Sequence, residues 1–335
     1  MRDENYILAI ESSCDDTSAA VLCNNVVLSN YIANQEIHSK YGGVVPEFAS
    51  RAHQQNIVPV VHAALAKAGV KKENLAAIAY TKGPGLMGSL LVGSSFAKGF
   101  SMALHKPLIE VNHMQAHILA HFIDDGSPIP TFPFLCLTVS GGHTQIVLVE
   151  DHLDMKVIGS TQDDAAGEAF DKVAKILGLP YPGGKEIDQL AKLGNPHAFS
   201  FAKSKMPELD FSFSGIKTSV LYFLKKEVAQ NESFVEENLA DICASFQKTI
   251  IDSLLEKLML ASKKYNIQQI AIAGGVSANS ELRQRLREEK KWTVYIPAFE
   301  FCTDNAAMIG IAGYYKFLRS EFADIHSKPS ARLAF

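Results

Sequence analysis

Cysteine is scarce in this sequence, and no two cysteines have the spacing of a metal-binding or redox motif. The five cysteines, Cys14, Cys23, Cys136, Cys243 and Cys302, are scattered, and no Cys-x-x-Cys occurs. Their distribution argues against a structural zinc ribbon and against a disulfide framework. The chemistry of the chain must therefore be sought in other residue types.

Long apolar runs are also missing, and the longest is far short of the roughly 20 residues that a membrane-spanning helix needs. The sequence begins Met-Arg-Asp-Glu-Asn and leads directly into an apolar strand, without a signal core or an Arg/Ser-rich transit segment. No membrane association is expected, and the default location is the cytoplasm. The net charge is −4, so a nucleic-acid substrate would require a local basic patch or help from a partner.

Two stretches of the sequence predict the same order of secondary-structure elements. At 335 residues the chain is long for one core, which favours two lobes. The first stretch predicts three strands, a helix, a strand, a helix and a strand, at residues 6–11, 18–22, 26–33, 46–68, 75–81, 89–104 and 106–111. The second repeats this order with extra helices inserted, and its strands are expected at residues 134–140, 145–150, 156–160, 270–273 and 293–296.

A duplicated unit of this kind indicates an α/β fold of the two-lobed actin/Hsp70/sugar-kinase (ASKHA) type, in which each lobe is a mixed sheet flanked by helices. Residues 1–112 are expected to form the N-terminal lobe and residues 113–305 the second. A helix within residues 306–335 is expected to pack back on the first lobe. The polar turns Ser12–Thr17 and Gly141–Thr144 are expected to point into a cleft between the lobes, where small residues and N–H groups suit a phosphate.

Two histidines stand four residues apart in His113-Met-Gln-Ala-His117. A helix over residues 113–122 places both imidazoles on one face, where they could bind one metal ion or could be ordinary half-buried histidines. His121 lies roughly 12 Å along the helix axis from His113, too far to share that ion. A zinc peptidase would need His-Glu-x-x-His, and Met114 occupies the position of the glutamate.

The segment Gly83-Pro-Gly85-Leu-Met-Gly88 has the glycine spacing of a dinucleotide-binding fingerprint. Glu110, near the end of the next strand, stands where that fingerprint has its acidic residue. However, it follows the fourth predicted strand instead of the first strand of a βαβ unit. No Lys-Ser/Thr pair follows it, as a phosphate-binding Walker loop requires. We interpret this segment as a tight turn between a strand and a helix.

Three other glycine-rich turns could bind a ligand or could be turns only. Gly141-Gly142, after Ser140, offers exposed amides to an anion. Gly274-Gly-Val-Ser-Ala-Asn279 enters a helix, where Asn279 could bind a sugar or base edge and Ser277 could cap the helix. The third turn contains Gly183-Gly184, with Asp171 and Asp188 nearby in the sequence. Its glycines would leave the N-terminus of the next helix accessible to a ligand.

The last predicted helix starts at Cys302-Thr303-Asp304-Asn305. Thr303 or Asp304 could cap this helix. Asp304 is also the kind of hard oxygen ligand that would complete a site made of two histidines and one carboxylate.

Taken in order, the motifs resemble the TsaD family, the tRNA N6-adenosine threonylcarbamoyltransferases once classed as glycoprotease-like. The resemblance runs from Ile7 to about Gly310 and rests on the following segments: His113–His117, Val139–Gln145, Asp164–Lys172, Tyr181–Gly184, Phe213–Lys217, Gly274–Asn279 and Cys302–Ala307. It implies the ASKHA fold and one metal ion, iron or zinc, held by His113, His117 and Asp304. It also implies that threonylcarbamoyl-AMP is bound by Thr138, Val139, Ser140, Gly141, Gly142, Asp171, Gly184, Asp188 and Asn279.

The reaction that the resemblance implies is transfer of the threonylcarbamoyl group to the N6 amine of the adenosine 3′-adjacent to the anticodon, in tRNAs that read codons starting with A. The bacterial form, to which this chain is most similar, works with the partner proteins TsaB and TsaE. Glu11 and Asp15, in the first turn, are candidates for handling the amine proton or for orienting water and metal. A kinase that acts on small molecules, or an ATP-driven scaffold of Hsp70 type, would share the fold without needing a transition metal.

Overall fold

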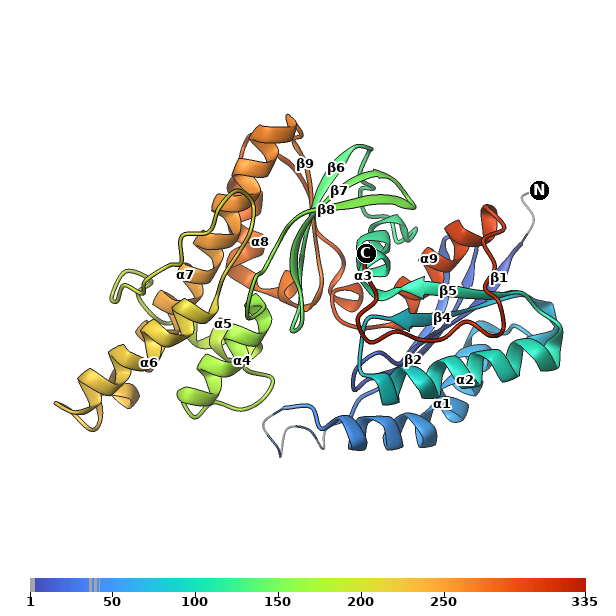
Figure 1. The fold of residues 1–335 in the computed structure, drawn as a ribbon, viewed down its shortest axis with the longest axis horizontal. Coiled ribbons are helices and arrows are strands. Elements are labelled where there is room, and N and C mark those ends of the chain that lie inside the picture. The colour runs from blue at the N-terminus through green and yellow to red at the C-terminus, as the bar shows by residue number, and fades with distance from the viewer. Residues whose placement is uncertain (1–3, 36–37, 39–40, 42) are drawn as a thin grey trace. The chain divides into compact units, whose positions relative to one another are not determined.

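The computed structural model describes residues 4–35, 38, 41 and 43–335 (Figure 1). Its internal contacts divide the chain into two compact units. Unit 1 comprises the chain up to Pro130 together with Asp151–Met155 and Pro297–Phe335, and unit 2 comprises Thr131–Glu150 and Lys156–Ile296.

Unit 1 is built on a five-stranded sheet in the order β3-β2-β1-β4-β5. Strand β1 pairs antiparallel with β2 and parallel with β4. The elements of this unit are β1 (Tyr6–Glu11), β2 (Thr17–Cys23), β3 (Val26–Ala33), α1 (Pro46–Ala68), β4 (Leu75–Gly83), α2 (Met87–Leu104), β5 (Leu108–Asn112), α3 (His113–Leu119) and α9 (Ala306–Leu318), with short 3-10 turns at Lys72–Asn74, Ala120–Phe122 and Phe299–Phe301.

Helices cover both faces of the unit 1 sheet, as the apolar side chains on both sides of its central strands require. Leu8 and Ile10 of β1 share a core with Ile57 and Val61 of α1. The alternate residue Ile7 faces α9 instead, where a Cβ added at Gly313 would contact it. Figure 1 shows α1 and α2 together on one side of the sheet and α9 on the other. Helix α9 therefore packs on the sheet of unit 1.

Unit 2 carries the second five-stranded sheet, in the order β8-β7-β6-β9-β10, with its helices packed in a layer. Leu135, Leu137 and Val139, at alternate positions of the central strand β6, lie in one core with Phe170 and Phe246. The elements are β6 (Phe134–Val139), β7 (Thr144–Asp151), β8 (Asp154–Ser160), α4 (Ala166–Ile176), α5 (Gly183–Ala191), α6 (Ser214–Val228), α7 (Phe234–Tyr265), β9 (Gln269–Ala273), a 3-10 turn at Gly275–Ala278, α8 (Ser280–Glu288) and β10 (Thr293–Tyr295).

The two sheets have the same topology. In each, the first strand of the unit pairs antiparallel with the second and parallel with the fourth, and the fifth strand lies at one edge. The predicted duplication of element order is confirmed, and with it the mixed α/β fold class. Among the described residues no helix is long and apolar enough to cross a membrane.

The turn after α5 supplies a test of packing within unit 2. A Cβ added at Gly194 would lie 2.1 Å from the carbonyl oxygen of Ala240 in α7, and backbone cannot move aside as a flexible side chain can. We expect Gly194→Ala to destabilise the protein by about 2 kcal/mol and to lower its Tm by several degrees. The matched control is Gly99→Ala in α2, where the added Cβ would meet no atom within 4 Å and alanine favours the helix. Equal Tm values for the two variants would contradict the packing argument.

Candidate functional site

The helix α3 presents His113 and His117 on one face, as the spacing predicts. The α-helix ends at Leu119 and continues as a 3-10 turn over Ala120–Phe122. Its N-cap is Asn112, whose Oδ1 accepts hydrogen bonds from the backbone N–H groups of Met114 at 2.9 Å and Gln115 at 3.3 Å. Both histidines are buried, and their rings lie edge to face with centroids 4.7 Å apart.

Asp304 reaches the same place from the segment that precedes α9. The expectation that Thr303 or Asp304 caps this helix is wrong, because Asn305 is the N-cap and accepts from the N–H of Met308 at 3.1 Å. The N–H of Ala306 donates to Oγ of Ser18 at 2.8 Å. Since other groups satisfy the start of the helix, the Asp304 carboxylate is available to the two histidines.

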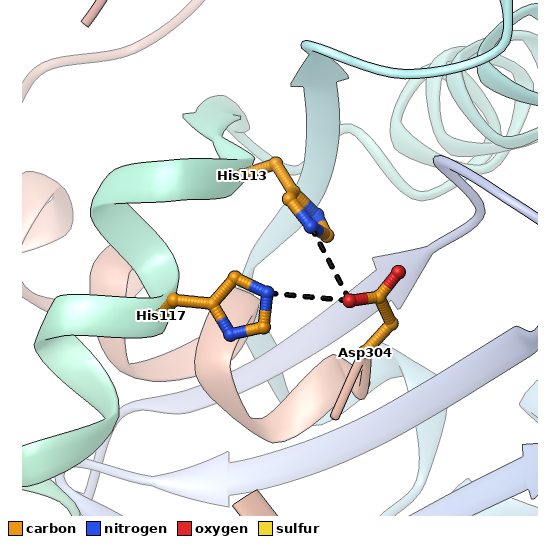
Figure 2. A group of neighbouring side chains, drawn as sticks. All are labelled: His113, His117 and Asp304. Carbon is orange, nitrogen blue, oxygen red and sulfur yellow. Dashed lines mark hydrogen bonds and ion pairs between the residues drawn. The ribbon is translucent and has the colours of Figure 1, made fainter. Parts of the chain in front are cut away.

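Figure 2 shows that one carboxylate oxygen of Asp304 lies opposite both imidazoles. Its Oδ1 is 3.2 Å from Nε2 of His117 and 3.4 Å from Nε2 of His113. One ligand atom from each residue can be chosen so that all three lie within 4.8 Å of one another. Ligand atoms about 2.0–2.1 Å from a tetrahedral ion are separated by about 3.3 Å, so the donor set fits a zinc- or iron-sized ion. His121, in the 3-10 turn, is not part of this group.

The side chain of Glu11 fixes the orientation of His113. Its Oε2 accepts from Oγ1 of Thr81 at 2.6 Å and lies 3.1 Å from Nδ1 of His113, and Oε1 accepts from the N–H of Ser13. The hydroxyl of Ser13 is also 3.1 Å from Nδ1 of His113. A carboxylate acceptor at Nδ1 keeps the proton on that nitrogen and leaves Nε2 as a donor to a metal.

The two histidines and the carboxylates of Glu11 and Asp304 shift one another's pKa values. Burial alone would lower the pKa of His113, but the carboxylates of Asp304 and Glu11 hold it well above the ordinary histidine value. Burial also lowers the pKa of His117, whose Nδ1 has no hydrogen-bond partner among the described residues. The two carboxylates both have lowered pKa values, because the attraction of His113 outweighs the cost of their burial. A positive charge at the three ligand atoms is thus stabilised before any ion arrives.

Asp15 and its neighbour Asp16 lie beside this group in the turn after β1. Both are half-buried. Burial, reinforced by the charges of Asp15, Asp304 and Glu11, raises the pKa of Asp16 to about 7. Asp16 is therefore a titratable group near the histidines that the sequence motifs did not single out.

The predicted ligand loops of unit 2 gather at the end of β6. Thr138 and Val139 are buried within the strand, so their side chains are directed into the protein. Gly141 and Gly142 are exposed, and a Cβ added at either would meet no atom within 4 Å. Ser140 lies between these two environments, and its hydroxyl accepts from the N–H of His143 at 3.1 Å. Ligand access at this turn is therefore through the backbone of its two glycines.

The remaining predicted residues lie around the N-termini of α5 and α8 in the same unit. Asp171 accepts from the N–H of Gly183 at 2.8 Å, and burial raises its pKa although the amides of Gly183 and Gly184 oppose the rise. Asp188 accepts from both the N–H and the hydroxyl of Ser280, at 3.1 and 2.8 Å.

Asn279 uses both ends of its amide inside unit 2. Its Oδ1 caps α8 by accepting from the N–H of Leu282 at 3.0 Å, and its Nδ2 donates to Gln247 at 2.7 Å. The alternative that Ser277 caps this helix is wrong. Asn279 is the N-cap of α8.

Three residues that orient the site were missed by sequence analysis. Ser13 and Thr81 contact the Glu11–His113 pair and come from different strand ends. Only the fold brings them together, and no spacing signal marks them. Asn112 did carry a signal, since asparagine directly before a helix is a preferred N-cap.

The fold and the site together define a class: a two-lobed ASKHA-type α/β protein in which two buried histidines and one partly exposed aspartate could hold a metal ion. The sequence matches the family model TsaD, described as tRNA N6-adenosine threonylcarbamoyltransferase, over residues 26–311. The chain belongs to this family of transferases.

Curated relatives carry the same description over nearly their whole length. The tRNA N6-adenosine threonylcarbamoyltransferase of Christiangramia forsetii is 63% identical over 333 residues, covering 98% of each chain. That of Riemerella anatipestifer is 59% identical with the same coverage.

Solved structures of low identity share the fold. HypF of T. kodakarensis matches with a TM-score of 0.64 at 12% identity, over 96% of this chain and 49% of that one. Component A of the Acidaminococcus fermentans (R)-2-hydroxyglutaryl-CoA dehydratase matches with a TM-score of 0.53 at 17% identity, over 93% and 98%.

Proposed function

We propose that this chain, acting in the cytoplasm, transfers the threonylcarbamoyl group from threonylcarbamoyl-AMP to the N6 amine of the adenosine 3′-adjacent to the anticodon, in tRNAs that read codons beginning with A. The observation that carries the proposal is the near-complete match to curated relatives of this activity, at 63% identity for one of them. In the reaction, the bond between the carbamoyl carbon and the phosphate oxygen breaks and a carbon–nitrogen bond forms. AMP leaves, and the amine loses one proton.

We propose that His113, His117 and Asp304 hold one Fe(II) or Zn(II) ion through Nε2, Nε2 and Oδ1. Support comes from the convergence of these three atoms and from the electrostatics of the group, which stabilises positive charge. When bound, the ion would act as a Lewis acid that polarises the carbonyl group or neutralises charge on the leaving phosphate. Three protein ligands leave coordination positions open to substrate.

In our proposal the donor is bound by residues of unit 2. The exposed amides of Gly141 and Gly142 are suited to the phosphate, since no side chain crowds them. Gly184, in the first turn of α5, adds a helix N-terminus that favours an anion. Thr138, Val139, Ser140, Asp171, Asp188 and Asn279 complete the donor site in this proposal. The hydrogen bonds of Asp171, Asp188 and Asn279 hold the N-termini of α5 and α8 in place.

Glu11 and Asp15 receive different roles. We propose that Glu11 orients His113, because its fully buried carboxylate contacts Ser13, Thr81 and His113. Asp15, with Asp16 beside it, is exposed enough to handle the proton of the amine or to orient water.

Two protein partners are also proposed, a TsaB-like and a TsaE-like protein, together with a separate enzyme that makes the adenylate. The support is the similarity of the motifs to the bacterial form of the family. The net charge of −4 does not favour binding of the negatively charged tRNA by this chain alone, so a partner is expected to contribute to tRNA binding.

The test is a reconstitution. The chain, the two partners, threonylcarbamoyl-AMP and unmodified tRNA are incubated, and the tRNA is digested and analysed by mass spectrometry for threonylcarbamoyladenosine. We expect product with the wild-type chain and none with a tRNA in which guanosine replaces the target adenosine. A wild-type chain that yields no product under these conditions contradicts the proposed function, whereas ATP hydrolysis in place of product would favour the scaffold alternative.

A further inference from the structure

The segment after α9, residues 327–335, runs across unit 1 and ends beside the histidine helix. Figure 1 shows this segment, in red, passing β4 and β5 and ending next to α3. Its backbone bonds to the end of β4 and to the loop that follows. The N–H of Ser330 donates to the carbonyl of Lys82 in β4 at 2.9 Å, and the N–H of Gly85 in the loop donates to the carbonyl of Ala331 at 3.2 Å. Further along, the carbonyl of Ala334 accepts from Nδ2 of Asn112 at 2.8 Å.

The contact with the loop after β4 is too close to be incidental. A Cβ added at Gly83 would lie 1.9 Å from the carbonyl oxygen of Ser330, and Gly83 has φ +150°. Upstream, Ser327 is held by Lys98 through its carbonyl and by Glu110 through its hydroxyl. The segment is therefore fixed at both ends of its path and leaves no space for a side chain at Gly83.

From this loop, contacts lead to His113. The N–H of Leu86 donates to the carbonyl of Ser13 at 2.7 Å, and a Cβ at Gly85 would lie 2.4 Å from the same oxygen. Ser13 in turn has its hydroxyl 3.1 Å from Nδ1 of His113. A shift of the 83–86 loop would thus be transmitted to a group that orients one of the proposed ligands.

A second path goes through Asn112. This residue closes β5 and caps α3, so its side chain fixes where the helix begins. Because α3 has only seven residues and both histidines lie within it, the helix depends on its cap and its packing more than on its own length. The bond from Nδ2 to Ala334 fixes the amide so that Oδ1 faces Met114 and Gln115.

We infer that residues 330–334 are a positioning segment of the His113–His117–Asp304 group: they fix Asn112 and the 83–86 loop, and through them the two histidines. This inference rests on the proposed metal centre for its consequence, but the positioning of α3 can be measured without any metal. The segment acts on the three ligands through Asn112 and, by way of the 83–86 loop, through Ser13.

The test uses two variants of the full chain in zinc titrations and in hydrogen exchange. One chain ends at Ser330, which removes the acceptors at Ala331 and Ala334. The other carries Asn112→Ser, which keeps a good N-cap but cannot reach Ala334. We expect each to raise the zinc Kd about 10-fold. This is the lower end of the loss of metal affinity that follows when an outer-shell partner of a metal ligand is removed. The two combined should weaken zinc binding no more than the truncation alone, because the truncation already removes the acceptor that Asn112→Ser cannot reach.

Hydrogen exchange at Met114 and Gln115 separates positioning from general stability. We expect about 10-fold faster exchange at these amides in both variants, with the strands of unit 2 unchanged. The control is Arg332→Ala, which removes an exposed side chain of the segment and leaves its backbone bonds in place. It should match the wild-type chain.

Three outcomes are decisive. Wild-type zinc affinity and exchange in both variants would overturn the inference. So would uniformly faster exchange throughout the truncated chain together with wild-type behaviour of Asn112→Ser, because the segment would then be a general structural element. If the wild-type chain binds no zinc, the proposed metal centre fails, and the exchange at Met114 and Gln115 still decides whether the segment positions α3.

Discussion

Replacing Asp304 with asparagine is expected to lower the affinity for zinc at least 100-fold and to reduce threonylcarbamoyladenosine formation to background. The side chain keeps its shape, but a neutral amide oxygen or nitrogen replaces the carboxylate oxygen that lies 3.2 and 3.4 Å from the two Nε2 atoms. Because outer-shell partners alone contribute 10–100-fold to metal affinity, loss of a direct anionic ligand should exceed that range. The measurement is competition with a chromophoric zinc chelator, together with the metal content of the purified protein.

The matched control for this variant is Asp124→Asn. Asp124 is an exposed aspartate of the same unit, and its backbone N–H donates to the carbonyl of Asn25. The control should retain wild-type affinity and activity. If Asp304→Asn also binds zinc like the wild-type chain, Asp304 is not a ligand and the site must be reassigned. If it loses activity while keeping its metal, Asp304 acts on the substrate instead.

Much of this site could be predicted because its parts have local signals. The spacing of His113 and His117 is a property of one helix turn, and the structure places both on the same face of α3. The fold was predictable for a similar reason: short apolar runs bounded by turn residues predicted the strands, and their repeated order predicted the two sheets that are observed.

The contacts that surround the site residues could not be predicted from the sequence. Glu11 was predicted near the site. Whether it accepts the proton of the amine or orients a histidine depends on its contacts with Thr81 and His113, which lie 70 and 102 residues away in the sequence. Likewise, Asn279 has an amide that suits a base edge, yet in the structure that amide caps α8 and bonds to Gln247. The type of a side chain determines which interactions it can make, and the packing around it determines which of them it makes.

The prediction that separates the two roles of Glu11 is the variant Glu11→Gln, which we expect to raise the zinc Kd about 10- to 100-fold. Glutamine has nearly the same shape as glutamate but presents one acceptor and one donor. Placing its oxygen toward Thr81 and His113 would set the NH₂ group against the N–H of Ser13, so two donors would face each other. The opposite orientation satisfies Ser13 and turns the NH₂ group toward Nδ1 of His113.

This second orientation favours the wrong form of the imidazole. An NH₂ group beside Nδ1 stabilises the tautomer in which Nδ1 is unprotonated and Nε2 carries the proton. A protonated Nε2 cannot bind a metal, and Nε2 is the atom that lies 3.4 Å from Asp304. The expected loss of affinity therefore arises without removing any ligand and without leaving a cavity.

Measured side by side, zinc affinity and turnover distinguish the alternatives. If Glu11 positions His113, Glu11→Gln weakens zinc binding, Glu11→Asp restores part of it, and turnover recovers as zinc is raised to saturation. If Glu11 is instead the base for the amine, Glu11→Gln binds zinc like the wild-type chain and loses kcat at every zinc concentration, which would overturn the positioning role. The exposed Glu73→Gln serves as the control for loss of one carboxylate from unit 1 and should leave both quantities unchanged. The outcome shows whether Glu11 orients His113 or acts on the substrate. Its burial and its three contacts favour the first role.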